Sequence, residues 1–214
     1  MMKRNNFPFS AVLGLNHAKT AILIVLVNPR AGGLLISGPR GIGKSTLMRS
    51  TQELIERPWR DIPVSVTEDR LFGTIDTEKA IYSGQKKLYP GIINEADQGV
   101  LYLDDANLLR EDLLDFILNI AEVGAYQLER DGLSLRCDTS FTVAAINPES
   151  GMLSGACLDQ FGLFVNVDNI HDENTRVEIL KRTISFEKDC ASFCKLWKLE
   201  NEKIKKAIHS AMSL

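Results

Sequence analysis

The amino-acid sequence predicts an α/β fold in which a five-stranded parallel sheet is flanked by helices. Short apolar runs typical of buried strands alternate along the chain with longer segments typical of helices. One strand leads into a glycine-rich turn, and another ends in two adjacent carboxylates. Because the carboxyl ends of parallel strands meet at one edge of a sheet, we expect both features at a shared ligand-binding edge.

Breaker residues and apolar periodicity set the expected boundaries of the elements. Pro29 ends the first helix, Gly124 ends a later one, and Asp131-Gly132 lies between two alternating runs typical of a hairpin. In chain order we expect a helix over 17–27, a strand over 34–36, a helix over 44–56, a strand over 62–66, a short helix within an irregular excursion to 91, a helix over 92–96, a strand over 100–103, a helix over 108–123, a hairpin over 125–136 and strands over 141–146 and 163–167.

Two apolar stripes predict core-facing helix surfaces. The first, in the helix over 108–123, consists of Leu109, Leu113, Phe116, Ile117 and Ile120. The remainder of the chain, 172–214, is typical of helix, and its second half predicts the packing of a helical hairpin. The apolar residues of that second half are Phe193, Leu196, Trp197, Ile204, Ile208 and Met212.

The composition excludes several classes of protein. A hydrophobic content of 44% and a charged content of 25% are ordinary for a globular protein, and a net charge of −3 gives no basic field for nucleic acid. No apolar run is long enough to span a bilayer and no signal peptide is visible, so we expect a cytoplasmic protein without a membrane partner. Cys190 and Cys194, four residues apart, would suit zinc or redox chemistry, but burial as small apolar residues is favoured for all four cysteines.

The glycine-rich turn has the G-x-x-x-x-G-K-[ST] pattern of a phosphate-binding loop. Glycines allow the backbone to wrap closely around an anion, and the loop N–H groups then face the phosphates. Lys44 would reach the β- and γ-phosphates, and the Ser45 hydroxyl would ligate Mg²⁺. A fortuitous glycine turn is the alternative, but the strand before the loop and the helix after it both fit the motif. The expected nucleotide-binding residues are Gly38, Pro39, Arg40, Gly41, Ile42, Gly43, Lys44, Ser45 and Thr46.

Polar residues follow two further strands of the predicted sheet. The strand over 100–103 delivers Asp104 and Asp105, and a carboxylate there is placed to hold Mg²⁺ directly or through water. Alternatively, Asp105 caps the helix that follows. Asn147 follows the strand over 141–146, where its amide would orient an attacking water or contact the γ-phosphate; a turn residue before Pro148 is the alternative.

Together these motifs, in this chain order, resemble an AAA+ ATPase, and more closely the ATPase (I) subunit of magnesium chelatase and its cobalt-chelatase relatives. The family carries F-P-F-S-A-x-x-G, A-T-E-D-R-x-x-G-T-x-D, P-G-L-L-x-x-A-x-x-G-x-L-Y-x-D-E-x-N-L-L, E-R-x-G, G-N-P-E-x-G and L-D-R-F-G-L. The corresponding segments of this chain are 7–14, 67–76, 90–109, 129–132, 146–151 and 158–163.

The resemblance implies a P-loop AAA+ domain over 1–170 and the start of an incomplete helical lid over 171–214. It also implies that ATP and Mg²⁺ are bound, that Asp104 serves the metal, that Asp105 serves the water and that Asn147 is the sensor-1 residue. The 67–90 excursion resembles the family's insert in helix 2, and the 126–136 hairpin its pre-sensor-1 insert. Such subunits form homo-oligomeric rings, hexamers in this family, which act with a sister subunit bearing an integrin-like domain and a large tetrapyrrole-binding subunit.

Several departures from the family pattern are visible. Asp105 stands where the family usually has Glu, and Gln160 stands where it has the arginine taken to act on a neighbour's ATP; Arg130 or Arg136 is a candidate substitute. The sensor-2 part of the lid is missing, and so is the cysteine-bearing insertion of the photosynthetic subunit. Two other functions therefore stay open beside the chelatase motor. One is a nucleotide-binding scaffold that hydrolyses ATP poorly, and the other is a MoxR-like chaperone.

Overall fold

The computed structural model describes residues 6–75, 88–130, 132–148 and 153–213. Its strands are β1 (Leu34–Gly38), β2 (Trp59–Ile62), β3 (Gly73–Ile75), β4 (Leu88–Pro90), β5 (Gly99–Leu103), β6 (Ala125–Arg130), β7 (Leu133–Asp138), β8 (Phe141–Pro148) and β9 (Leu163–Asn166). Its helices are α1 (Asn16–Val27), α2 (Lys44–Ser50), α3 (Glu68–Phe72), α5 (Ile92–Glu95), α6 (Glu111–Val123), α7 (Gly155–Asp159), α8 (Glu173–Lys188) and α9 (Cys190–Met212). Short 3₁₀ turns cover Phe9–Ala11, Pro29–Ala31, Thr51–Glu53 and Ala106–Leu108.

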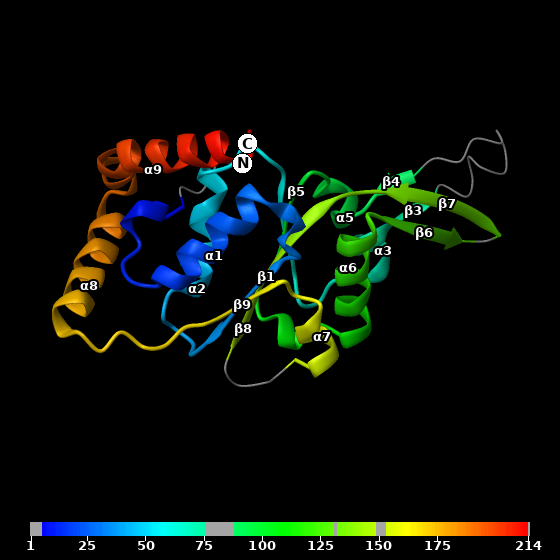
Figure 1. Ribbon diagram of the computed structural model, residues 1–214, viewed down its shortest axis with the longest axis horizontal. Coiled ribbons are helices and arrows are strands. Elements are labelled where there is room, and N and C mark those ends of the chain that lie inside the picture. The colour runs from blue at the N-terminus through cyan, green and yellow to red at the C-terminus, as the bar shows by residue number, and fades with distance from the viewer. Residues whose placement is uncertain (1–5, 76–87, 131, 149–152, 214) are drawn as a thin grey trace.

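The central sheet has five parallel strands in the order β2-β5-β8-β1-β9, which confirms the predicted fold class (Figure 1). The strand of the phosphate-binding loop, β1, lies between β8 and β9, and β5 is the next strand beyond β8. The carboxyl ends of β1, β5 and β8 therefore lie side by side at one edge. That arrangement brings together segments that are far apart in the sequence.

Alternation along the strands divides the core into two layers, one on each face of the sheet. Leu34 and Ile36 of β1 belong to the layer that also contains the buried side chains of α1 and α2. Leu35, between them, belongs to the opposite layer with the buried residues of α5 and α6. All three are fully buried, as expected of a central strand covered by helices on both faces.

Two expected elements differ most from those observed. The strand predicted over 62–66 runs instead from Trp59 to Ile62, where it pairs with β5; Pro63, which has no N–H to donate, follows its last residue. The helix predicted over 44–56 ends at Ser50 and continues as a 3₁₀ turn. The buried hydroxyls of Ser50 and Thr51 each donate to the carbonyl three residues earlier at 2.6 Å, which tightens the helix end.

Both insertions contain antiparallel strand pairs. The excursion between β2 and β5 holds the short pair β3–β4, which the sequence predicted as irregular, and its residues 76–87 lie outside the described residues. The hairpin predicted over 125–136 is confirmed as β6–β7, and it projects from the body of the domain (Figure 1). Tyr126 ties the two insertions together, because its hydroxyl donates to the Phe72 carbonyl at 2.7 Å and lies 2.5 Å from the Asn94 amide oxygen.

The C-terminal helices α8 and α9 pack against the N-terminal segment rather than against the sheet (Figure 1). Asn201 of α9, which is buried, accepts a hydrogen bond from the Ser10 N–H at 3.0 Å, and the Arg182 guanidinium of α8 donates to the Ala11 carbonyl at 3.0 Å. Phe193 is buried in an aromatic cluster with Phe7.

Three residues of the predicted stripes are exposed, contrary to expectation: Phe116 is 59%, Leu196 76% and Met212 42% exposed. The apolar stripe of α6 is wider than the part of the helix that its neighbours bury. Phe116 therefore lies at the margin of the stripe, where its ring contacts that of Phe72. On α8, the apolar Val177, Leu180 and Ile184 are also exposed. Within the described ranges, no helix is both long and apolar enough to cross a bilayer.

Candidate functional site

The phosphate-binding loop adopts backbone geometry that its glycines make possible. Gly38, the last residue of β1, has φ +145°, and a Cβ there would lie 2.2 Å from the Val167 carbonyl oxygen. Gly41 and Gly43 also have positive φ, but a Cβ at either position would meet no atom within 4 Å. Gly38 is therefore required by a close backbone approach, whereas Gly41 and Gly43 serve the turn itself.

Lys44 begins α2 and lies within the loop. Its side chain is only 6% exposed, and its ammonium donates to the carbonyls of Gly38 and Pro39, both at 2.6 Å. The loop therefore wraps around a buried cation, whose charge is compensated by loop carbonyls. An anion bound in the loop would compete with these two carbonyls for the ammonium.

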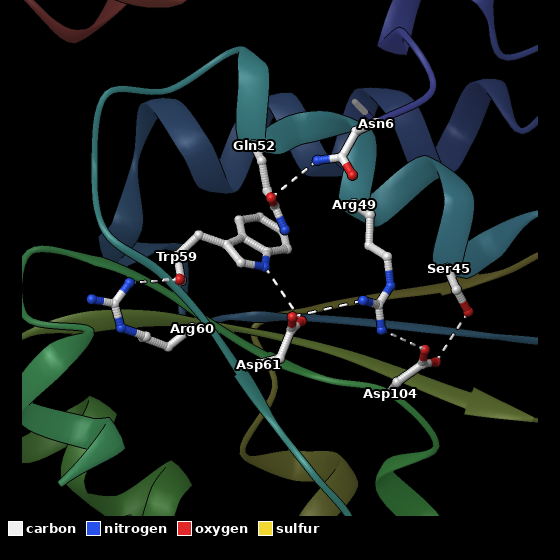
Figure 2. Close-up of polar contacts among 8 residues, drawn as sticks. All are labelled: Asn6, Ser45, Arg49, Gln52, Trp59, Arg60, Asp61 and Asp104. Carbon is white, nitrogen blue, oxygen red and sulfur yellow. Dashed lines mark hydrogen bonds and ion pairs between the residues drawn. The ribbon is translucent and has the colours of Figure 1, made fainter. Parts of the chain in front are cut away.

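Ser45 and Asp104 meet across the edge of the sheet, as the sequence predicts. The Ser45 hydroxyl donates to Asp104 Oδ1 at 3.0 Å, although the two residues are 59 positions apart (Figure 2). Together with Lys44 and Asp105 they line a polar cavity of about 370 Å³. The loop residues that also line it are Arg40, Gly41, Gly43 and Thr46. A hydroxyl and a carboxylate facing such a cavity are the oxygen donors that Mg²⁺ prefers, so this donor set fits the metal that the sequence predicts.

Asp105 borders the cavity without capping a helix. It precedes the 3₁₀ turn Ala106–Leu108 with φ +52°, and its side chain makes no capping hydrogen bond. The helix that it was alternatively expected to cap begins only at Glu111. Because the Asp105 side chain makes no capping hydrogen bond and the helix begins six residues later, the capping interpretation of Asp105 was wrong.

Asn147 lies in β8, between the strand of the loop and the strand of the carboxylates. Its backbone pairs with Ser37 of β1, and Ala145, two residues earlier, pairs with Leu103 of β5. Lys44, Asp104 and Asn147 thus share one edge of the sheet. The side chain of Asn147 lies outside the described part of the chain, as do the side chain of Arg130 and residues 149–152.

A second cavity of about 580 Å³ adjoins the first and was not predicted from the sequence. It shares Gly41, Gly43 and Thr46 with the polar cavity, and Ile42 of the loop also lines it. Its other walls come from the N-terminal segment (Phe7, Ala11, Val12 and Leu13), from Asn169 and Ile170, and from α8, which contributes apolar side chains and also the charged Arg176, Arg182 and Glu187. The uncharged lining residues of α8 are Ile179, Leu180, Thr183 and Phe186. Because these walls are largely apolar, the space suits a flat ring attached to phosphates in the loop. Only the F-P-F-S motif pointed to this segment, and its contact with α8 needs tertiary structure.

Arg49 is a further residue at the site that the sequence did not reveal. It follows Ser45 by one turn of α2, and its guanidinium contacts Asp104 Oδ2 at 3.3 Å and Asp61 Oδ2 at 3.7 Å (Figure 2). It also lies over the Tyr102 ring, 5.4 Å from the ring centroid. Partial burial lowers the pKa of Arg49, but Asp61, Tyr102 and Asp104 outweigh burial and raise that pKa above its ordinary value.

Gln160 lies away from the polar cavity of its own chain. Its amide contacts the Asp115 carboxylate at 3.5 Å and lines a cavity with Gly32, Ser140 and Gly162, which precede β1, β8 and β9. That cavity is at the amino edge of the sheet, opposite the phosphate-binding loop. Residue 160 therefore lies at the opposite edge of the sheet from the phosphate-binding loop of its own chain.

The cysteines form no metal centre in the described ranges, where no cluster of three or more potential ligand side chains occurs. Cys137 and Cys157 are buried, as predicted. Cys190 and Cys194 are half-buried on α9, with their sulfur atoms 4.0 Å apart. Burial raises the pKa of the Cys194 thiol to about 12, so this thiol stays protonated at neutral pH.

Comparisons with known proteins agree with this geometry. The family model for the AAA domain (dynein-related subfamily) matches residues 33–161. The magnesium-chelatase 38 kDa subunit of Cereibacter sphaeroides is 35% identical over 239 residues, which cover 96% of this chain and 72% of that protein. The magnesium-chelatase subunit ChlI homolog of Methanocaldococcus jannaschii is 33% identical over an alignment of 252 residues. That alignment covers 100% of this chain and 69% of that protein.

A solved structure shows the same likeness. In the complex between subunits BchI and BchD of magnesium chelatase, based on a single-particle cryo-EM reconstruction, one chain matches with a TM-score of 0.72 and 34% identity. The match covers 98% of this chain and 76% of the other. Sequence motifs, sheet order and all three comparisons agree, and the chain therefore belongs to the AAA domain family and, within it, to the magnesium-chelatase I subunits.

Proposed function

We propose that this chain is an ATP-binding and ATP-hydrolysing motor subunit of a chelatase, which drives metal insertion into a tetrapyrrole held by a partner. The observation that carries the proposal is the meeting of Lys44, Ser45 and Asp104 around one polar cavity. In this proposal residues 1–170 are the nucleotide-binding domain and 171–214 begin the lid. The proposed location is the cytoplasm.

The proposed binding roles follow from the donors and acceptors in the two cavities. The loop N–H groups and Lys44 bind the phosphates, and the apolar cavity beside Val12 and Ile179 receives the base. Ser45 and Asp104 hold Mg²⁺, which supplies charge neutralisation at the phosphates. Arg40 and Thr46 border the phosphate region from the two ends of the loop.

The proposed chemical roles belong to Asp105 and Asn147. Asp105 accepts a proton from the attacking water, and Asn147 orients that water or contacts the γ-phosphate. The water oxygen bonds to the γ-phosphorus as the bond to the leaving ADP oxygen breaks. Because Asp is shorter than Glu by one C–C bond, Asp105 must hold its water closer to the backbone than a Glu would.

We further propose a homo-oligomeric ring, with a sister subunit bearing an integrin-like domain and a large tetrapyrrole-binding subunit as partners. In such a ring Gln160 would face a neighbour, because it lies at the amino edge of the sheet, away from the phosphate-binding loop of its own chain. The solved BchI–BchD complex supports a partner subunit. Arg130 and Arg136, both on the hairpin, are the proposed candidates for the cation at the neighbour's site in place of Gln160; Arg136 is exposed and pairs with Asp138 at 2.9 Å.

The second candidate is a nucleotide-binding scaffold that hydrolyses ATP poorly, and Asp105 and Gln160 are the residues that favour it. Steady-state phosphate release by the full chain with Mg²⁺ and ATP separates the two candidates. A motor turns over in the wild type, and Asp105→Glu does not raise its rate, because the longer side chain displaces the carboxylate from the water that Asp105 already holds. A scaffold is nearly inactive, and Asp105→Glu with Gln160→Arg raises its rate by on the order of 100-fold or more. Wild-type turnover at ordinary ATPase rates would eliminate the scaffold.

A further inference from the structure

The carboxylate of Asp104 is held at both of its oxygens by side chains of the same helix. Ser45 Oγ donates to Oδ1 at 3.0 Å, and an Arg49 nitrogen donates to Oδ2 at 3.3 Å (Figure 2). Residues four apart on a helix lie on one face, so α2 presents both donors to the end of β5 together. The carboxylate therefore has little freedom to rotate.

Arg49 also contacts a carboxylate on β2, the strand next to β5. Its other terminal nitrogen lies 3.7 Å from Asp61 Oδ2 on β2, and Asp61 also faces the Trp59 indole N–H at 3.5 Å (Figure 2). Asp61 of β2 pairs in register with Tyr102 of β5. Tyr102 precedes Asp104 by two residues, so Asp61 and Asp104 lie near the same end of these two neighbouring strands. A planar guanidinium with two outer nitrogens can bridge carboxylates in this arrangement, whereas the single ammonium of a lysine cannot.

We propose that Arg49 is a positioning residue that fixes the Asp104 carboxylate in the orientation needed to hold Mg²⁺. The inference rests on the proposed function, because it concerns the same metal. Mg²⁺ demands nearly ideal octahedral geometry, so a rotated carboxylate is a poor ligand for it. Groups that orient metal ligands in this way typically change metal affinity or activity by about 10- to 100-fold when they are removed.

A purely structural ion pair is the competing explanation, and the exposure of Arg49 argues against it. Its side chain is 44% exposed, and pairs at such positions contribute only about 0–1 kcal/mol to stability. Arg60, on the adjacent strand, offers a matched control. It is 43% exposed and pairs with Glu95 at 3.0 Å, and within the described part of the chain it forms no ion pair with Asp104.

The test measures how nucleotide affinity depends on Mg²⁺ in the full chain. A fluorescent ATP analogue is titrated in EDTA and then at increasing Mg²⁺ for the wild type, Arg49→Lys, Arg49→Met, Asp61→Asn and Arg60→Met. Arg49→Lys is the central variant, because it keeps the charge and removes the bridge. Thermal melting and the affinity in EDTA report whether each variant is folded.

We expect Arg49→Lys and Arg49→Met to raise the Mg²⁺ concentration for half-maximal affinity gain by about tenfold, with affinity in EDTA within about twofold. Asp61→Asn should give a smaller rise, and Arg60→Met none. An unchanged Mg²⁺ requirement in Arg49→Lys would overturn the inference and leave the proposed function intact. An equal loss in Arg49→Lys and Arg60→Met would also overturn it. A wild type that binds no nucleotide, or binds it without any effect of Mg²⁺, would overturn the proposed function and this inference with it.

Discussion

Replacing Lys44 with methionine should separate the stability of the fold from its ability to bind a nucleotide. The ammonium is buried and bonded to two loop carbonyls at 2.6 Å, so its removal leaves the Gly38 and Pro39 acceptors without this partner. It also removes the cost of burying a charge, and the two effects oppose one another. We therefore expect the free energy of unfolding to change by only about 1 kcal/mol in either direction.

Nucleotide affinity should fall much further. A hydrogen bond to a charged group contributes about 1.5–3 kcal/mol, and Lys44 is expected to reach two phosphates. About 3–6 kcal/mol of binding energy is then at stake, less what the ammonium loses when it leaves its carbonyl partners. A net loss of about 3 kcal/mol corresponds to a fall in affinity of more than 100-fold.

The assay pairs a fluorescent-nucleotide titration with urea unfolding of the same preparations. Methionine approximates the length of the lysine side chain, so the loop keeps its packing. An affinity within about threefold of the wild type would refute the assignment of the phosphate-binding loop. A loss of several kcal/mol in the free energy of unfolding would instead show that the lost hydrogen bonds of the ammonium are not offset by removing a buried charge.

Two further predictions concern the backbone approach at the loop and the attachment of the C-terminal helices. Gly38→Ala forces a Cβ against the Val167 carbonyl at 2.2 Å, whereas Gly41→Ala meets no neighbour; we expect losses of about 3 kcal/mol or more for the first and about 1 kcal/mol for the second. Similar melting temperatures for the two variants would contradict the close approach. Asn201→Ala leaves the Ser10 N–H without its acceptor and should cost about 1–3 kcal/mol, with faster amide exchange at Ser10 than in the wild type. Unchanged exchange at Ser10 would contradict the assignment of Asn201 as the acceptor that protects this N–H.

The sequence predicted those parts of the fold whose signal is local. The loop over Gly38–Thr46 combines a strand, a glycine turn and a helix within a few residues, and its geometry follows from positive-φ glycines and a single lysine. The strand before Asp104 is an uninterrupted apolar run, which predicts burial on both faces of a sheet. The hairpin followed from Asp131-Gly132 between alternating runs.

The failures occurred where neighbours decide the outcome. The segment over 59–66 contains apolar residues on both sides of Pro63, and only pairing with β5 selects Trp59–Ile62 as the strand. Periodicity alone placed Phe116 and Leu196 in the core, but a helix buries only as much of its apolar face as its neighbours cover. No helix in the described ranges covers those two side chains fully, so they remain exposed.

The sequence by itself therefore determined the chemistry available to this protein: an anion-binding loop, a hydroxyl, paired carboxylates and an amide, each at the end of a predicted strand or the start of a helix. Tertiary structure alone decided which of these groups meet. It set Ser45 against Asp104, Arg49 between two carboxylates on neighbouring strands, and the N-terminal segment against α8 around an apolar cavity. The physical reason is that a motif is encoded by residues adjacent in the chain, whereas the contacts that orient its side chains come from packing between distant segments.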